Sequence, residues 1–126
     1  MDKLLKYNGV QEALKFLRED DERTLQEHLE MCQIPAPSYE EGEKAEYARK
    51  KMVDAGLSEV HVDEVGNVLG TWKGTGNGPR IMVAGHTDTV FPRETDLTLK
   101  KEGERYSCPG IGDDTRAVAE LLSLAR

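Results

Sequence analysis

Apolar residues in the first third of the chain recur three or four positions apart, which is the spacing of an amphipathic helix. The positions concerned are Val10, Ala13, Leu14 and Leu17. The acidic pair Asp20-Asp21 interrupts this pattern and is placed to cap a second helix, whose apolar side ends at Cys32. The sequence therefore predicts two consecutive helices before residue 33.

A third helix is predicted after a proline-containing segment. Residues 34–37 hold two prolines and are expected to be extended, because a proline disfavours helix in the residue before it. Ser38-Tyr39-Glu40-Glu41 matches a capping box, with Ser38 as N-cap and Glu41 at N3. The helix should end at Gly56, a typical C′ residue. The position of Glu40 and Glu41 in a first helical turn explains them without a catalytic role.

The middle of the chain has strand patterns. Residues 60–62 and 68–72 alternate about a turn at Gly66-Asn67. The continuous apolar run Ile81-Met82-Val83-Ala84, bounded by turn residues, predicts a strand buried on both faces and flanked by helices. A last helix should begin near Asp114-Thr115. Helices before and after a doubly buried strand indicate an α/β fold.

The last predicted helix has an apolar face with no obvious partner. This face consists of Val118, Leu121, Leu122 and Ala125. We expect it to be uncovered in this chain and to promote self-association, so a homo-oligomer is the expected assembly.

Composition narrows the class of protein. The 126 residues make one domain at most, and 17 Lys and Arg against 24 Asp and Glu give a net charge of −7. Such an acidic chain repels phosphate backbones, so no nucleic acid partner is expected. No apolar stretch approaches the ~18 residues that span a bilayer, and the N-terminus lacks the apolar core of a signal peptide. Cys32 and Cys108 form no Cys-x-x-Cys pair. We therefore expect a cytoplasmic protein with reduced thiols and no membrane partner.

The first candidate for chemistry follows the predicted buried strand. His86 and Asp88 in Gly85-His86-Thr87-Asp88-Thr89 are two residues apart, so an extended backbone projects both to the same side. A neutral imidazole is a zinc ligand, and a neighbouring carboxylate can hold its tautomer. An ordinary strand end, with a solvated His and a turn-forming Asp, explains the same residues and is the commoner case.

The second candidate is the glycine-rich segment Pro109-Gly110-Ile111-Gly112-Asp113-Asp114-Thr115. Two adjacent carboxylates that enter a helix cannot both cap it, so Asp113 could bind a metal while Asp114 or Thr115 caps. In the alternative interpretation, one Asp caps and the other is solvated. His28 and His61 suit surface positions, and Cys108 is either reactive or an idle buried thiol.

Five short motifs carry a resemblance to a known family. They are Ile34-Pro35-Ala36-Pro37-Ser38-Tyr39-Glu40-Glu41-Gly42, Gly56-Leu57, Gly66-Asn67-Val68, Gly85-His86-Thr87-Asp88-Thr89-Val90 and Pro109-Gly110-Ile111-Gly112-Asp113-Asp114. In this order they resemble the M20 metallopeptidases, which include glutamate carboxypeptidases, peptidase T-type aminopeptidases, dipeptidases and aminoacylases. The Asp113-Asp114 pair is most similar to the peptidase T branch, whereas Arg116-Ala117 replaces the Lys and Gly of many members.

The resemblance implies a fold, a cofactor and a reaction. The fold would be a three-layer αβα sandwich with a mixed sheet, of which residues 1–126 form the N-terminal part. The complete site would hold two Zn²⁺, with Co²⁺ or Mn²⁺ as substitutes. His86 would bind one zinc, Asp113 would bridge both, and Asp88 would be the catalytic-site acid that orients His86. The substrate would be a small peptide or an N-acyl amino acid, hydrolysed as in an aminopeptidase, carboxypeptidase or aminoacylase.

The resemblance also implies parts that this sequence lacks. Family members carry a Glu-Glu pair with the general base, a further acidic ligand, a late His and a dimerisation domain, all after the position of Asp113. We therefore expect this chain to bind zinc weakly and to be inactive alone. A non-catalytic fragment or assembly module is the alternative. An aspartyl-phosphate-type phosphatase is disfavoured because His86 stands where a carboxylate nucleophile is required.

Overall fold

The computed structural model describes residues 2–126, which form helices and two small antiparallel sheets. The helices are α1 (Asp2–Leu5), α2 (Asn8–Glu19), α3 (Asp21–Cys32), α4 (Gly42–Asp54) and α5 (Thr115–Ala125). The strands are β1 (Ser58–Val62), β2 (Val68–Thr71), β3 (Lys100–Glu102) and β4 (Arg105–Ser107). The α/β composition is therefore confirmed, and each helix predicted from apolar spacing is present. No helix in this part of the chain is both long and apolar enough to cross a membrane.

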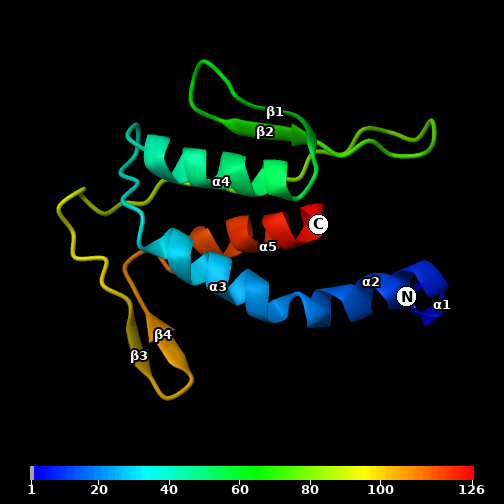
Figure 1. The fold of residues 1–126 in the computed structure, drawn as a ribbon, viewed down its shortest axis with the longest axis horizontal. Coiled ribbons are helices and arrows are strands. Elements are labelled where there is room, and N and C mark those ends of the chain that lie inside the picture. Colours follow the sequence, from blue (N-terminus) through cyan, green and yellow to red (C-terminus); the bar gives the residue numbers. More distant parts are fainter. Residues whose placement is uncertain (1) are drawn as a thin grey trace.

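The elements stack in an order that differs from their order along the chain. Helix α5 packs between α3 and α4, and the β1–β2 hairpin lies on the other side of α4 (Figure 1). The β3–β4 hairpin projects away from this stack, and α1 and α2 extend beyond it as an arm (Figure 1). Strand β1 pairs with β2 and β3 with β4, each antiparallel. Residues 2–126 thus contain neither a mixed sheet nor three complete layers.

Glycines lie at the end of α4 and in the turn between β1 and β2, as predicted. Gly56 follows the C-cap of α4 with φ of +82°, and Gly66 adopts φ of +93° in the turn between β1 and β2. A left-handed backbone carries no penalty for glycine, because it has no Cβ. Both turn positions were therefore predictable from local sequence.

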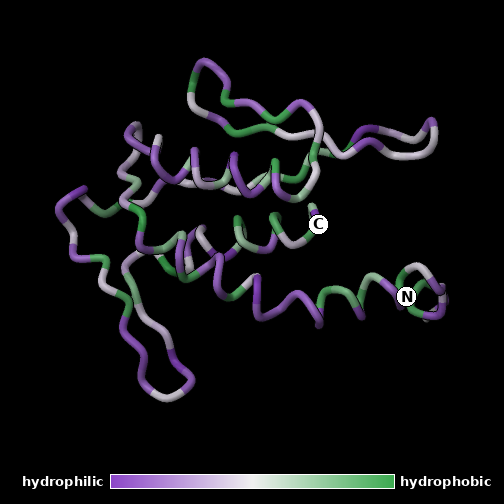
Figure 2. The backbone as a smooth tube through the Cα atoms, in the orientation of Figure 1, coloured by the Kyte–Doolittle hydropathy of each residue, from purple (hydrophilic) through white to green (hydrophobic). Residues whose placement is uncertain are grey.

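The core forms where α3, α4 and α5 meet. Val118, Ala119 and Leu122 of α5 are buried against Met31 of α3. Figure 2 shows the apolar stretch of α5 between the more polar α3 and α4. Helices α3 and α4 thus bury Val118 and Leu122, so the expected exposure of this face is wrong for these two residues, whereas Leu121 and Ala125 are partly exposed. The expected homo-oligomer stays a prediction.

A buried ionic network links the start of α3 to the end of α5. Arg126 donates to Asp20 and also to Glu27, at 2.6 Å, and Ser123 Oγ donates to Asp20 Oδ2 at 2.7 Å. Asp20 precedes α3 as predicted, but its side chain makes no capping hydrogen bond. Burial raises the pKa of Asp20, but hydrogen bonds from Arg126, Ser123 and Thr24 outweigh it and leave that pKa below its ordinary value.

The segment predicted as a doubly buried strand is exposed, so that prediction is wrong. Ile81 and Met82 are 82% and 83% accessible, and residues 81–84 form no strand. A central strand needs a hydrogen-bonded neighbour on each side and a packed layer on each face. The strands within residues 2–126 pair only among themselves as two hairpins, so they provide no such neighbour.

Candidate functional site

The structure brings together the three site residues that the sequence singled out. His86 Nδ1 lies 3.0 Å from Asp88 Oδ1, and His86 Nε2 lies 3.1 Å from Asp113 Oδ1. Asp88 follows His86 on the same extended segment, whereas Asp113 comes from the loop that precedes α5. One imidazole ring thus connects two carboxylates from segments far apart in the sequence.

Ser38 holds the carboxylate that faces the back of the ring. Its Oγ donates to Asp88 Oδ2 at 2.6 Å, and the amide of Thr89 donates to the Ala36 carbonyl at 2.7 Å. Pro37 and Thr89 form an isolated parallel bridge. The proline-containing segment is extended as predicted, and its hydrogen bonds hold Asp88 and Thr89 in place.

This attachment explains why the predicted capping box is absent. Helix α4 begins at Gly42 with Glu41 at its N-cap, and no side chain caps it. The Glu41 carboxylate accepts the amide of Tyr39 at 2.6 Å instead. The hydroxyl of Ser38 is engaged by Asp88, so the long-range contact replaces the local one.

Asp114 positions the backbone of His86. Asp114 occupies the N-cap position of α5 without a side-chain capping bond, and its Oδ2 accepts the amide of His86 at 3.1 Å. The expectation that Asp114 or Thr115 caps this helix through its side chain is therefore wrong for Asp114. The adjacent carboxylates divide their roles, because Asp113 contacts the imidazole ring while Asp114 contacts the backbone behind it.

His28 supports the loop that carries Asp113. It is buried on α3, and its Nε2 lies 2.6 Å from the carbonyl oxygen of Ile111. The surface position predicted for His28 is wrong, because the loop folds over α3 and covers the ring. His61 is exposed as predicted, with Nδ1 2.7 Å from the Glu59 carbonyl oxygen.

Both thiols are buried close together near the start of this loop. Cys32 and Cys108 are buried and free, and Cys108 Sγ lies 3.2 Å from the carbonyl oxygen of Cys32. Burial, with the neighbouring Cys108, raises the pKa of Cys32 to about 12. A thiol with such a pKa is a poor nucleophile. Of the two alternatives left open for Cys108, an idle buried thiol is the one its burial supports.

A buried lysine lies close to the site. Lys44 of α4 is 1% exposed, and its Nζ lies 3.5 Å from Thr115 Oγ1. Burial lowers the pKa of Lys44, while Cys32, Cys108 and Asp88 oppose that shift by favouring its charged form. The sequence of α4 gave no sign that this lysine, unlike its neighbours Lys50 and Lys51, is buried.

Charges in the site favour an ionised carboxylate beside a basic imidazole. The hydrogen bond from Ser38 lowers the pKa of Asp88, with a further contribution from His86. Partial burial lowers the pKa of His86, but the hydrogen bonds to Asp113 and Asp88 outweigh it, so the pKa lies above its ordinary value. With its Nδ1 held by Asp88, the ring directs Nε2 toward Asp113 and solvent.

Two donors of the site lie at hydrogen-bond distance, slightly closer together than two ligands of one zinc ion. Ligands about 2.1 Å from a tetrahedral zinc lie roughly 3.4 Å apart. His86 Nε2 and Asp113 Oδ1 are 3.1 Å apart, so a shift of a few tenths of an ångström would accommodate an ion. Among the described side chains, residues 3–126, no group of three or more His, Cys, Asp or Glu is placed to hold one metal. These residues therefore fit part of a metal centre.

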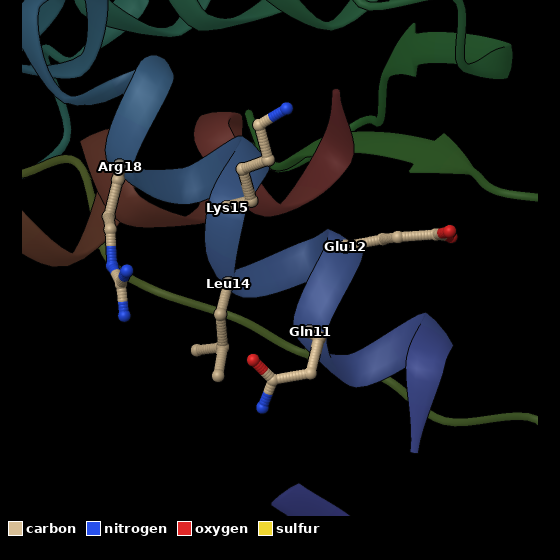
Figure 3. Close-up of a pocket in the computed structure, with 5 residues that line it drawn as sticks. All are labelled: Gln11, Glu12, Leu14, Lys15 and Arg18. Atoms are coloured by element: carbon tan, nitrogen blue, oxygen red, sulfur yellow. The ribbon is translucent and has the colours of Figure 1, made fainter. Parts of the chain in front are cut away.

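A pocket opens beside the imidazole, whereas a second hollow lies far from it. The first is lined by His86, Asp88, Asp113 and Cys108 together with residues 89–91 and 110–112. The second is formed by side chains of one helix, α2, that point in different directions (Figure 3). A surface with one wall and no convergent polar groups is a poor binding site. The pocket at His86 is therefore the candidate binding site, because His86, Asp88 and Asp113 converge there.

Comparison with known proteins gives a partial likeness. No family model matches the chain. A Pyrococcus abyssi protein provisionally named LysW-lysine/LysW-ornithine hydrolase is 35% identical over 79 residues. The match covers 63% of this chain and 19% of that relative, so the chain spans about a fifth of the relative's length. This partial likeness to a protein named as a hydrolase supports a hydrolase-type function.

Proposed function

We propose that this chain supplies part of a metal-dependent hydrolytic site that cleaves peptide or N-acyl amino acid bonds. The observation that carries the proposal is the contact of His86 with Asp113 at one ring nitrogen and with Asp88 at the other. The partial match to a named hydrolase agrees with it.

His86 and Asp113 are the proposed zinc ligands, and Asp88 is the proposed orienting acid. Asp88 would accept a hydrogen bond from Nδ1–H, which would leave the Nε2 lone pair free to bind a metal ion. Ser38 keeps Asp88 in place, and Asp114 fixes the main chain of His86. Zinc, when bound, would polarise the scissile carbonyl and lower the pKa of a water molecule. A second zinc bridged by Asp113 belongs to the same proposal.

A non-catalytic role for the isolated chain is the second candidate. It is favoured by the donor count, because two protein ligands leave most of the zinc coordination to water. None of the site contacts includes a side chain placed as general base, and loss of such a base costs about 10²–10⁴-fold in rate. We therefore propose that residues 1–126 bind zinc weakly and show no turnover alone.

Zinc titration by calorimetry tests this proposal. We expect weak binding, with a dissociation constant above about 10 μM, that is lost in His86→Ala. His61→Ala is the matched control, since His61 is exposed on the β1–β2 hairpin and outside the site; its binding should equal that of wild type. Di- and tripeptides and N-acyl amino acids assayed alongside should remain intact.

Two results would contradict the proposal. Zinc binding that survives His86→Ala unchanged would place the metal elsewhere. Zinc-dependent turnover by the chain alone would show that further ligands and a base come from residues not assigned here, or from a second copy.

A further inference from the structure

The two cysteines lie 76 positions apart in the sequence but meet in the structure. Cys32 is the last residue of α3, and Cys108 directly follows β4. Cys108 Sγ lies 3.2 Å from the Cys32 carbonyl oxygen and 3.3 Å from that of Leu97. Both cysteines are buried and carry free thiols. The fold thus brings an unoxidised pair of thiols together from two distant segments.

The two sulfur atoms are neighbours and are held only weakly. A hydrogen bond with the Cys108 side chain adds to burial in raising the pKa of Cys32. The other hydrogen bonds of these thiols run to backbone carbonyls, including one of 3.2 Å from Cys32 Sγ to the Leu29 oxygen. A thiol is a weak hydrogen-bond donor. A covalent bond between the sulfurs would therefore replace only weak contacts.

The two thiols differ in their access to small molecules. Cys108 lines the pocket beside His86, whose cavity is about 290 Å³, whereas Cys32 does not line it. Hydrogen peroxide is little larger than a water molecule, which takes about 30 Å³ of liquid, so it fits this cavity. The burial that leaves Cys108 idle toward large reagents does not exclude so small an oxidant, and Cys108 is the thiol it meets first.

We propose that Cys32 and Cys108 form an intramolecular disulfide when the protein is exposed to hydrogen peroxide. In the first step Cys108 Sγ attacks one peroxide oxygen, the O–O bond breaks, and Cys108 sulfenic acid and one water form. In the second step Cys32 Sγ attacks the sulfenic sulfur, the S–O bond breaks, and the Cys32 proton leaves with the hydroxide as a second water. Two thiols lose two electrons in total, and one peroxide is reduced to two waters.

Proximity allows a poor nucleophile to complete the second step. A partner held in contact has an effective concentration far above that of a reagent in solution. The charge of Lys44 also favours the Cys32 thiolate, against the effect of burial. Since burial still dominates the pKa of Cys32, we expect the disulfide to form slowly, over minutes to hours.

The disulfide would attach the Asp113 loop to α3 at a second point. His28 of α3 already holds the carbonyl of Ile111, and the amide of Ile111 donates to the Cys108 carbonyl at 3.1 Å. A bond from Cys108 to Cys32 adds a covalent attachment at the start of the same loop. Reversible disulfides of this kind serve redox sensing in reducing compartments. The oxidation state of the pair would then set how firmly this loop is held.

Peroxide treatment of the full chain tests the proposal. The chain is incubated with hydrogen peroxide and EDTA near neutral pH, its remaining thiols are blocked with N-ethylmaleimide in denaturant, and it is digested without reductant. Mass spectrometry should find peptides joined through Cys32 and Cys108 that dithiothreitol separates. In Cys32→Ser, dimedone should trap a sulfenic acid at Cys108. In Cys108→Ser, Cys32 should remain a thiol after the same exposure.

A melting experiment on the wild-type chain provides a readout that needs no variant. The bond closes a long loop of the unfolded chain, so the oxidised sample should melt at least about 5 °C above the same sample after dithiothreitol. Two blocked thiols after peroxide treatment, bonds found only between chains, or an unchanged melting temperature would each overturn the proposal. Sulfenic acid found at Cys32 in place of Cys108 would overturn the assigned order of the two steps.

Discussion

Gly85→Ala is the sharpest perturbation of the link between the site and the core. An added Cβ would lie 3.0 Å from Asp114 Oδ2, 3.3 Å from Leu121 Cδ1 and 3.5 Å from Val118 Cγ2. The first two separations are tighter than ordinary van der Waals contact, and both atoms are ends of side chains on or next to α5. The Asp114 carboxylate and the Leu121 methyl group must therefore shift by a few tenths of an ångström, and a shift of the carboxylate stretches its hydrogen bond with the His86 amide.

The expected cost can be assembled from its parts. Overpacking of this kind destabilises a protein by about 1–3 kcal/mol. Stretching the His86 N–H hydrogen bond to the Asp114 carboxylate adds to that cost. Replacing glycine by alanine also reduces the entropy of the unfolded chain, which offsets roughly 0.4–1 kcal/mol. The free energy of unfolding should fall by about 1–2 kcal/mol.

Urea unfolding followed by circular dichroism measures this change. Gly42→Ala is the matched control, because a Cβ at Gly42, the first residue of α4, has no neighbour within 4 Å. Alanine in a helix should raise the free energy of unfolding by up to about 1 kcal/mol relative to glycine. If Gly85→Ala were as stable as wild type, the close packing of the His86 segment on α5 would be refuted.

Two further changes test the buried charges. Asp20→Asn should lower the free energy of unfolding at pH 6 by about 1–3 kcal/mol, as measured by urea unfolding. Because folding lowers the pKa of Asp20 from 3.8, its stabilisation is present above that pH and is lost as the pH falls below it; a difference between variant and wild type that stayed constant down to pH 2 would contradict this account. Lys44→Met should raise the free energy of unfolding at pH 7 by roughly 1 kcal/mol, since the buried ammonium has one 3.5 Å contact, to Thr115 Oγ1. That gain should shrink as the pH approaches 10.5, where the lysine of the unfolded chain loses its charge. Lys50→Met, at an exposed position of α4, is the control and should leave the free energy of unfolding unchanged. A Lys44→Met variant less stable than wild type would show that surrounding groups stabilise the buried ammonium.

Local sequence determined the helices, the glycine that ends α4 and the position of the β1–β2 turn. Apolar spacing depends on the 3.6-residue period of a helix, and Gly56 and Gly66 supply backbone angles that other residues avoid. His86, Asp88 and Asp113 were also predictable as candidates, because their residue types and spacing match metal chemistry. Such signals are carried by a few neighbouring residues, so they need no knowledge of the rest of the fold.

Contacts between distant segments could not be predicted in this way. Ser38 was expected to cap α4 but binds Asp88, and His28 was expected at the surface but holds the Ile111 carbonyl. Asp114 occupies its expected N-cap position, yet its side chain binds the backbone of His86. In each case one polar group had a local and a distant partner available, and the packing of the segments decided between them.

Residues 81–84 show the same division most clearly. Their apolar run marks residues whose transfer out of water is favourable, yet burial requires neighbouring strands and covering helices that the run itself does not specify. The tertiary structure leaves the segment exposed because β1 to β4 pair as separate hairpins. Sequence determines which residues favour burial through their transfer free energy, whereas the arrangement of the other elements determines which of them are buried.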